Sequence, residues 1–325
     1  MKKILGFGAA LVDLLAHVDE EWIRLADVPK GGMNLVDDAT LRKLLSRVEN
    51  PVVVPGGSAC NTMVGVAKLS GKASFVSKVG NDDFGRLFAR HLENSGVENR
   101  MATSSVSTGT VLSAVTPDAE RTMFTFLGAS NEFSASDISP DLFDDVGILY
   151  LEGYRAYNGE CFSKAVRMAK RFGAKTALDF GSFGVVNDCR PLFDELFSER
   201  KIDIVIANEE EAKAYTGVSE EAALEKLSRI SPVAVVKLGA RGALIASDGV
   251  VSHVEAGKAK AVDTTGAGDL WASGFLYGIL SGLSMERSGI LGSLVANEVV
   301  QVVGAQIPES GWERIRGEVD SVLAR

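Results

Sequence analysis

Residues 263–269 read Asp263-Thr264-Thr265-Gly266-Ala267-Gly268-Asp269, and an apolar stretch with helical character, 270–278, follows them. A turn of small residues therefore leads into a helix and places a carboxylate in its first turn. Unpaired N–H groups at a helix start bind anions, phosphate above all. A carboxylate at that site can take the proton of a hydroxyl that attacks the phosphoryl group. The segment predicts an anion site with its own base, Asp269, although an ordinary glycine-rich turn with a first-turn aspartate would look similar.

The composition narrows the classes of protein. The chain has 325 residues, 46% of them hydrophobic, which suffices for one large α/β domain or two small ones. Its net charge of −9 and its lack of long basic runs argue against nucleic acid or an anionic membrane as the main partner. Cys60, Cys161 and Cys189 form no metal or disulfide pattern, and Asp13 interrupts the apolar N-terminal run. We expect a cytoplasmic protein without a membrane span.

Short apolar runs alternate with helical patterns along most of the chain. This alternation predicts an α/β fold with a doubly wound, mostly parallel sheet and helices on both faces. Strands are expected at 4–7, 74–79, 148–151, 176–179, 202–207, 233–238 and 243–246, and helices at 58–70, 84–94, 161–172, 209–215 and 220–230. Ligands of such sheets bind beyond the carboxyl ends of the strands.

Two stretches, 12–54 and 103–127, interrupt this rhythm and are richer in Thr, Ser and Val. They predict short antiparallel strands, for example 110–116 and 122–127 around a turn at 117–120. We expect them to form a small β-sheet lid over a main domain made of residues 1–11, 55–102 and 128–325. An open small sheet has edges to cover, so a homodimer through the lid and a monomer are both compatible with the sequence.

A second cluster precedes the helix expected at 58–70. Gly56 and Gly57 would let the backbone approach a ligand, Ser58 is a good N-cap, and Asn61 can donate and accept hydrogen bonds one turn later. The set suits a polyhydroxyl ligand such as a ribose, and a capped helix after a tight turn is the alternative. Asp13, which closes the apolar run at the N-terminus, would bind ligand hydroxyls or cap the next turn.

Two further segments follow expected strands. Asn208 and Glu211 share one helix face, and their oxygens suit Mg²⁺ with retained waters, although an Asn N-cap with first-turn acids explains them equally well. Downstream of Lys237, Gly239 and Gly242 would bring the backbone close to a nucleotide, and a hairpin turn explains them nearly as well.

Together these segments resemble the PfkB (ribokinase-like) family of carbohydrate and nucleoside kinases, over essentially the whole chain. The resemblance depends on three motifs: residues 55–85, which end in Lys-Val-Gly-Asn-Asp-Asp-Phe-Gly, the Asn-x-x-Glu element at 208–211, and residues 263–269. The N-terminal half is most similar to the adenosine-kinase branch of that family.

The resemblance implies a ribokinase-like fold, ATP as phosphoryl donor, and Asp269 as catalytic base. It implies that the amides of Gly266, Ala267 and Gly268 form the anion hole, that Asn208 and Glu211 act on Mg²⁺ through waters, and that a monovalent cation is a candidate activator. The substrate-binding candidates are Asp13, Gly56, Gly57, Ser58, Asn61 and Arg155. The nucleotide-binding candidates are Asn208, Lys237, Gly239, Gly242, Thr265 and Arg121, the last as a lid arginine over the phosphates.

We therefore predict ATP-dependent phosphorylation of a primary hydroxyl of a nucleoside, with adenosine as the first candidate. A sugar kinase for ribose, fructose or a related sugar would use the same chemistry. Arg155 slightly favours that alternative, because a cation at this position could meet an acidic or highly hydroxylated substrate. Two interpretations belong to other classes: a non-catalytic nucleoside-binding protein on the same fold, and a dinucleotide-dependent oxidoreductase suggested only by Gly6 and Gly8.

Overall fold

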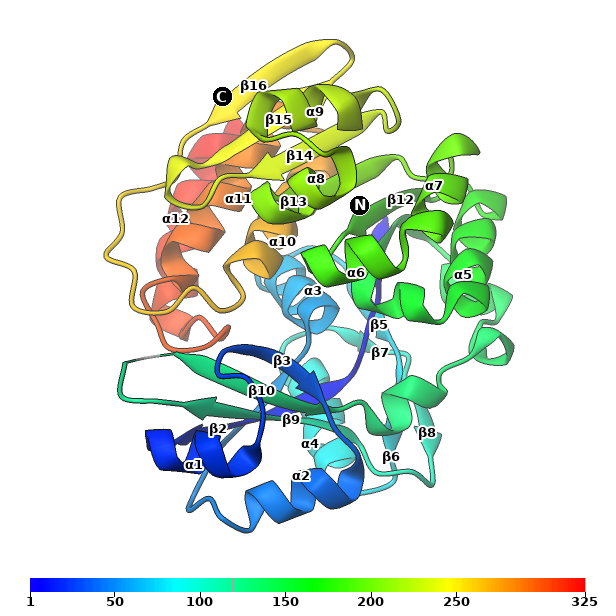
Figure 1. Ribbon diagram of the computed structural model, residues 1–325. Coiled ribbons are helices and arrows are strands. Elements are labelled where there is room, and N and C mark those ends of the chain that lie inside the picture. The colour runs from blue at the N-terminus through cyan, green and yellow to red at the C-terminus, as the bar shows by residue number, and fades with distance from the viewer. Residues whose placement is uncertain (119, 325) are drawn as a thin grey trace.

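Buried apolar strands form a large sheet in the computed structural model, which describes residues 1–118 and 120–324 (Figure 1). Ala119, in the predicted turn at 117–120, and Arg325 lie outside the described residues. The spatial order within the described part is β16 (Val250–Val254), β15 (Ala243–Ser247), β14 (Val233–Lys237), β13 (Ile204–Asn208), β12 (Lys175–Asp179), β11 (Val146–Glu152), β1 (Lys3–Phe7), β5 (Ala73–Val76) and β7 (Glu98–Asn99). Pairing is parallel from β14 to β7 and antiparallel from β14 to β16. The predicted doubly wound, mostly parallel sheet is confirmed.

Helices cover both faces of this sheet, as Figure 1 shows. On one face lie α5 (Gly159–Arg171), α6 (Phe183–Asp188), α7 (Arg190–Ser198), α8 (Glu209–Thr216) and α9 (Glu220–Ser228). On the other lie α3 (Ser58–Lys68), α4 (Asp83–Asn94), α10 (Ala267–Leu280) and α11 (Met285–Val299), with α12 (Glu309–Ala324) packed outside them. Central strands such as β11 are buried along their whole length because both faces are covered. No helix in the described part of the chain is long and apolar enough to cross a bilayer.

The predicted strand at 74–79 is two strands. The chain leaves β5 at Ser77, whose hydroxyl accepts the main-chain N–H of Ala10 at 3.0 Å. It then forms β6 (Lys78–Gly80), which pairs with β8 (Ala102–Ser104) in a separate two-stranded sheet. The single strand predicted over residues 74–79 therefore spans a change of sheet at Ser77.

The small sheet has the order β3 (Gly32–Leu35), β10 (Arg121–Phe126), β9 (Gly109–Val115), β2 (Leu11–His17) and β4 (Val52–Gly56). The expectation of antiparallel strands holds for β9 with β10 and for β2 with β4, but β2 pairs with β9, and β3 with β10, in parallel. The segment 12–54 also contains two helices, α1 (Glu20–Ala26) and α2 (Asp38–Leu45), which the prediction missed. Asp19 and Asp37 cap them by accepting the N–H groups of Trp22 and Thr40. The boundaries of the lid as a domain remain a prediction.

The two faces of the small sheet have different partners. Leu14, Leu112 and Phe124 share one face and are buried in the core that includes residues of α1 and α2. The cross-strand row Asp13, Val111 and Thr125 points to the opposite face, which lies toward α3 and α10 in Figure 1. Asp13 lies on this face, and the carboxylate of Asp269 raises its pKa, so this face of the sheet is turned toward the heptapeptide 263–269.

Candidate active site

The heptapeptide forms the turn before α10 and the first turn of that helix. Gly266 is the N-cap in the left-handed region (φ 72°), a conformation that favours glycine. The N–H of Ala267 donates to the carbonyl of Thr264 at 3.1 Å, whereas the amides of Gly268 and Asp269 have no hydrogen-bond partner among the described residues. Unpaired donors at a helix start are suited to an anion, but they are not the same three amides that the sequence analysis named, and the anion site stays a prediction.

Two side chains of α3 hold the carboxylate of Asp269. Ser58 donates from Oγ to Oδ1 at 2.7 Å, and Asn61 donates from Nδ2 to Oδ2 at 3.0 Å. Burial raises the pKa of Asp269, and the hydrogen bonds from Asn61 and Ser58 oppose that rise. Ser58 is not the predicted N-cap: Gly57 has that position, and the Ser58 hydroxyl is directed to Asp269. Both side chains thus position a carboxylate that is poised to accept a proton.

Asp13 lies opposite, in the small sheet. It is the third residue of β2 and not the end of the first strand, because the apolar run divides into β1 and β2. Burial raises the pKa of Asp13 to about 6, Arg121 lowers it and Asp269 raises it. A Cβ at Gly56 would lie 2.2 Å from Oδ2 of Asp13, and one at Gly57 (φ 96°) would lie 2.4 Å from the carbonyl oxygen of Ala9. Both glycines are therefore required by the close approach of Asp13 and of the Ala9 carbonyl, while their expected proximity to a ligand stays a prediction.

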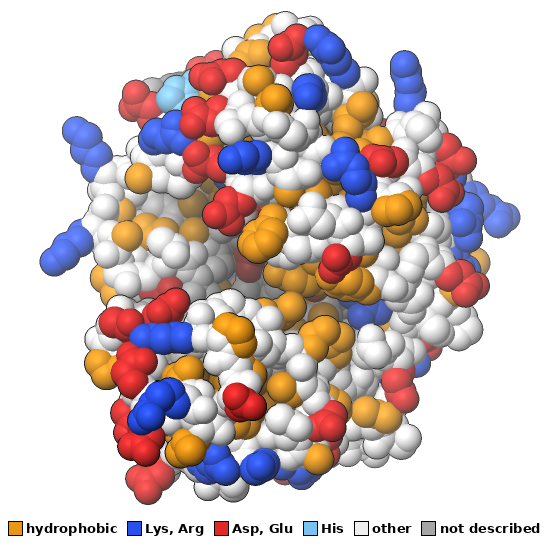
Figure 2. All heavy atoms as spheres, viewed as in Figure 1, with side chains coloured by type: hydrophobic (Ala, Val, Ile, Leu, Met, Phe, Trp, Pro, Cys, Tyr) orange, Lys and Arg blue, Asp and Glu red, His pale blue; other side chains and the backbone are white. Residues whose placement is uncertain are grey.

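A hydroxyl that the sequence analysis did not single out lies in the same row. Thr125 is 2% exposed, and its Oγ1 has no hydrogen-bond partner in the described structure. It aligns with Val111, which aligns with Asp13, so the unpaired hydroxyl shares the face that carries Asp13. The surface is hollowed where this small sheet meets the rest of the molecule (Figure 2). A buried hydroxyl without a partner is costly and needs an explanation.

Arg121 connects the small sheet to the heptapeptide. Its Nη2 donates to Oδ2 of Asp263 at 2.9 Å, and its Nη1 donates to Oγ1 of Thr265 at 2.5 Å. Asp263 also accepts the N–H groups of Thr265 at 2.9 Å and of Gly304 at 2.8 Å. The lid arginine is thus bound to the first aspartate of the motif. The sequence analysis gave Asp263 no role, although its position at the start of the motif, opposite Asp269 at the end, was a reason to expect one.

Lys237 lies beside the anion site. It ends β14, and its Nζ donates to Oδ2 of Asp179, at the end of β12, over 3.0 Å. A Cβ on Gly268 would lie 3.0 Å from the same Nζ. Burial opposes the charge of Lys237, but the carboxylates of Asp179 and Glu211 outweigh it, so the pKa of Lys237 lies above its usual value. A cation is therefore held at the unpaired amides of α10.

Asn208 and Glu211 form a reciprocal capping box at the start of α8. Glu211 accepts the Asn208 N–H at 2.8 Å and its side-chain amide at 2.8 Å, while Asn208 Oδ1 accepts the Glu211 N–H at 2.9 Å. Burial raises the pKa of Glu211, and the nearby carboxylate of Asp179 adds to the rise. Within the described residues, no group of three or more His, Cys, Asp or Glu side chains could hold a metal ion. The pair fits Mg²⁺ only as an oxygen contact to a cation held mainly by phosphates and water.

A cavity of about 410 Å³ opens beside these residues. Its lining is Asn208, Glu209, Glu210, Lys237, Gly239, Gly242, Ala267, Gly268, Trp271 and Ala296. Gly239 and Gly242 belong to the hairpin that joins β14 to β15 through the short helix η5 (Gly239–Arg241). The hairpin turn considered in the sequence analysis is therefore present, and both glycines also line the cavity. The cavity brings together most of the nucleotide-binding candidates.

Arg155 has a structural role in place of the predicted contact with the acceptor. It lies in η4 (Gly153–Tyr157), is 6% exposed, and donates to the carbonyls of Ser130 at 2.9 Å and Phe133 at 3.1 Å. Its guanidinium also lies over the ring of Phe7, 5.7 Å from the centroid. The guanidinium is therefore engaged by main-chain carbonyls, and these contacts give it a structural role.

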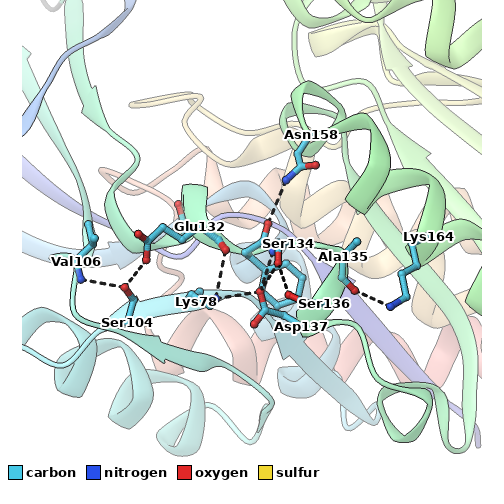
Figure 3. Close-up of polar contacts among 12 residues, drawn as sticks. Lys78, Ser104, Val106, Glu132, Ser134, Ala135, Ser136, Asp137, Asn158 and Lys164 are labelled. Atoms are coloured by element: carbon cyan, nitrogen blue, oxygen red, sulfur yellow. Dashed lines mark hydrogen bonds and ion pairs between the residues drawn. The ribbon is translucent and has the colours of Figure 1, made fainter.

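Those carbonyls belong to a segment fixed by a polar network (Figure 3). The segment comprises η1 (Gly128–Glu132) and η2 (Ala135–Asp137) and leads to η3 (Pro140–Phe143). Lys78 Nζ donates to Asp137 Oδ2 at 2.9 Å and to the Glu132 carbonyl at 3.2 Å, and Lys164 donates to the Ala135 carbonyl at 2.6 Å. The network fixes the segment that connects β10 of the small sheet to β11 of the large sheet.

Glu152 is a buried carboxylate that the sequence analysis did not assign. At the end of β11, it accepts the N–H of Ala59 at 3.0 Å and the N–H of Ala9 at 3.4 Å. Burial raises the pKa of Glu152 to about 7, and the hydrogen bond from Ala59 lowers it. It joins the start of α3 to the turn before β2. A lone acid that ends an apolar strand was its only signal.

The comparisons with known proteins agree with this geometry. Residues 33–311 match the model of the pfkB family carbohydrate kinases. The chain is 32% identical over 268 residues to a ribokinase of Mus musculus, covering 77% of this chain and 80% of that one. It is similar in structure to the adenosine kinase from Sinorhizobium meliloti (TM-score 0.89, 34% identity, 97% and 99% of the two chains). A probable sugar kinase protein from Rhizobium etli CFN 42 gives a TM-score of 0.90 at 32% identity, with 99% of each chain covered.

The chain therefore belongs to the pfkB family of carbohydrate kinases. It is a kinase, a phosphotransferase with a hydroxyl group as acceptor, and the family implies ATP as donor. Its relatives include kinases of sugars and of nucleosides. The predicted family, fold and enzyme class are confirmed.

Proposed function

We propose that this kinase phosphorylates a primary hydroxyl of a nucleoside, with adenosine as the first candidate. The observation that carries the proposal is the carboxylate of Asp269, held by Ser58 and Asn61 beside the unpaired amides at the start of α10. The likeness to an adenosine kinase over nearly the whole chain supports a nucleoside acceptor. The sequence-based reason for preferring a sugar was a cation at Arg155, and that guanidinium is bound to carbonyls.

In this proposal Asp269 accepts the proton of the acceptor hydroxyl as its oxygen attacks the γ-phosphoryl group of ATP in line. The amides of Gly266 and Gly268 stabilise charge on the transferring group, whereas the amide of Ala267, the third of the predicted set, donates to the carbonyl of Thr264. Such a base is typically worth ~10²–10⁴-fold in rate, and loss of one preorganised donor costs about 3–4 kcal/mol. The remaining acceleration comes from positioning and water exclusion.

Asp13, Gly57 and Asn61 hold the other hydroxyls of the acceptor, and Gly56 and Ser58 shape the wall beside them. The small sheet acts as a lid, because it carries Asp13 and is joined to the heptapeptide through Arg121. Its opening admits the acceptor, and its closure excludes water.

Charge balance supports a divalent cation with the nucleotide. The carboxylates of Asp179, Glu211 and Asp269 interact with one another and with a single ammonium, that of Lys237. A polyphosphate would add negative charge to this set, and Mg²⁺ would neutralise part of it when bound. Asn208, oriented by Glu211, would contact that cation through water. A monovalent cation as a further activator remains a prediction.

A sugar kinase is the second candidate, supported by the similarity to a ribokinase. A sugar acceptor would leave the chemistry at Asp269 unchanged.

The small sheet also offers a surface for a homodimer. Met33 and Leu35 on its edge strand β3 are 44% and 63% exposed, and exposed apolar side chains on a sheet edge support the expected homodimer through the lid.

A panel of nucleosides and sugars tests the acceptor, with ADP formation as readout and ATP as donor. We expect the highest kcat/KM with a nucleoside. A higher kcat/KM with ribose or fructose would replace the first candidate by the second. Tight nucleoside binding without ADP formation from any acceptor would favour the non-catalytic alternative.

A further inference from the structure

The ion pair between Asp179 and Lys237 is the most enclosed one near the anion site. The two side chains are 6% and 14% exposed, and the Nζ–Oδ2 distance is 3.0 Å. They end β12 and β14, on either side of β13, and face the same carboxyl edge of the sheet. Buried pairs of this kind contribute little net stability, because desolvation offsets their attraction. The placement of this pair therefore calls for a reason other than stability.

One partner is fixed and the other is mobile by its chemistry. Asp179 also accepts the N–H of Gly181 at 3.2 Å, and its side chain has few rotatable bonds. Lys237 has a flexible side chain, and its ammonium lies against Gly268, beside the unpaired amides at the start of α10. The ammonium can thus turn from Asp179 to a phosphate without a movement of the backbone.

We propose that Asp179 is a positioning residue for phosphoryl transfer: it holds the Lys237 ammonium at the start of α10 and yields it to the phosphates of the bound nucleotide. The proposal rests on the proposed function. Lys237 is then a catalytic residue beside Asp269, since it would contact the phosphate, and Asp179 acts only through Lys237. Asp179 competes with the nucleotide for the ammonium, so its presence weakens ATP binding while it orients Lys237 for transfer.

This arrangement predicts opposite effects on binding and turnover. In Asp179→Asn the ammonium loses the carboxylate to which it is hydrogen-bonded, and the site carries one negative charge less. We expect ATP to bind about three- to tenfold more tightly, the scale of a lost unfavourable charge contact. Turnover should fall about 100-fold, the scale of a reacting group displaced by ~1 Å. A merely structural defect would weaken both.

The matched control is Asp203→Asn. Asp203 accepts Lys170 at 2.6 Å and lies at the opposite, amino-terminal edge of the same strands. This variant loses an ion pair of the same chemistry away from the anion site. It should lower the melting temperature, but it should not tighten ATP binding while lowering kcat. A second variant, Lys237→Met, should weaken ATP binding at least about tenfold.

Calorimetric titration with MgATP in the absence of acceptor gives the binding result independently of turnover, and steady-state kinetics with the best acceptor gives kcat and KM. Tighter binding with lower kcat in Asp179→Asn supports the proposal. Weaker ATP binding or an unchanged kcat in Asp179→Asn overturns it. If Asp179→Asn does not fold, normal ATP binding by Lys237→Met overturns it. A wild-type protein without kinase activity would refute the proposed function, whereas the binding titrations would still decide whether the pair yields to phosphate.

Discussion

Arg121 donates from Nη2 to Oδ2 of Asp263 at 2.9 Å, although 142 residues separate them in the sequence. The two side chains are 23% and 17% exposed, so solvent screens this ion pair only in part. Because Arg121 belongs to the small sheet and Asp263 begins the turn that leads to Asp269, the contact joins the proposed lid to the turn that carries the proposed base.

Replacement of Arg121 by glutamine should therefore loosen the lid. We expect the KM for the acceptor to rise about three- to tenfold, since a partly buried ion pair is worth ~1 kcal/mol. ADP release in the absence of acceptor should also increase, because water reaches the γ-phosphoryl group when closure is incomplete. Coupled ADP assays with and without acceptor measure both effects. Arg42→Gln, which removes an exposed pair with Asp38 on α2, should change neither, and a normal KM in Arg121→Gln would contradict the lid role.

Asp269→Asn tests the base. The amide keeps the shape of the side chain but cannot accept a proton, so kcat should fall by ~10²–10⁴-fold while the acceptor still binds. Turnover and the rise in melting temperature caused by the acceptor are the two measurements. Asp83→Asn, a change at an exposed carboxylate in the first turn of α4, should be neutral in both. Turnover near the wild-type level would rule out Asp269 as the base.

The pH dependence of kcat/KM for the acceptor should have an acidic limb near pH 6. Burial raises the pKa of Asp13 to about 6, and the ionised carboxylate, which accepts with both oxygens, should bind the acceptor hydroxyls more strongly than the neutral acid does. Activity should therefore decline as the pH falls through that value. Arg121 lowers the pKa of Asp13, whereas burial and the hydrogen bonds from Asn61 and Ser58 are the main influences on the pKa of Asp269. In Arg121→Gln the limb should move to higher pH, and a limb that stays in place would assign it to Asp269.

The raised pKa of Asp13 should also make the free energy of unfolding depend on pH. A raised carboxyl pKa in the folded state means that the native protein binds protons more strongly than the unfolded chain between about pH 4 and pH 6. The free energy of unfolding therefore falls as the pH rises through this window. Asp13→Asn should be more stable than the wild type at pH 7, and the difference should vanish below pH 4. Denaturant titrations at both pH values measure it.

The sequence predicts those parts of the structure that depend on neighbours along the chain. The buried strands, the helices between them and the turn at Gly266 follow from local patterns of apolar residues and glycine. The missed helices of the small sheet had local signals too, since Asp19 and Asp37 are typical N-caps, but a search for strands in 12–54 did not consider them.

Contacts between distant segments could not be predicted in this way. Arg155 looked like a substrate contact, yet its partners are carbonyls more than 20 residues away that become neighbours only after folding. Asp179 and Glu152 each end a strand without any surrounding motif, and their roles depend on Lys237 and Ala59, which other strands and helices bring beside them. The order of strands in a sheet decides such pairs, and a local pattern does not reveal that order.

Thr125→Val tests whether the unpaired hydroxyl of the small sheet serves the acceptor. Valine has the same shape, so removal of a buried hydroxyl without a partner should stabilise the free protein by about 1 kcal/mol. If the hydroxyl donates to the bound acceptor, the KM for the acceptor should rise while kcat stays constant. Melting temperature and steady-state kinetics give the two results. Thr110→Val is the matched control: its hydroxyl donates to the Thr108 carbonyl at 3.2 Å, so this variant should lose stability. A Thr125→Val enzyme with unchanged KM would show that the hydroxyl does not contact the acceptor.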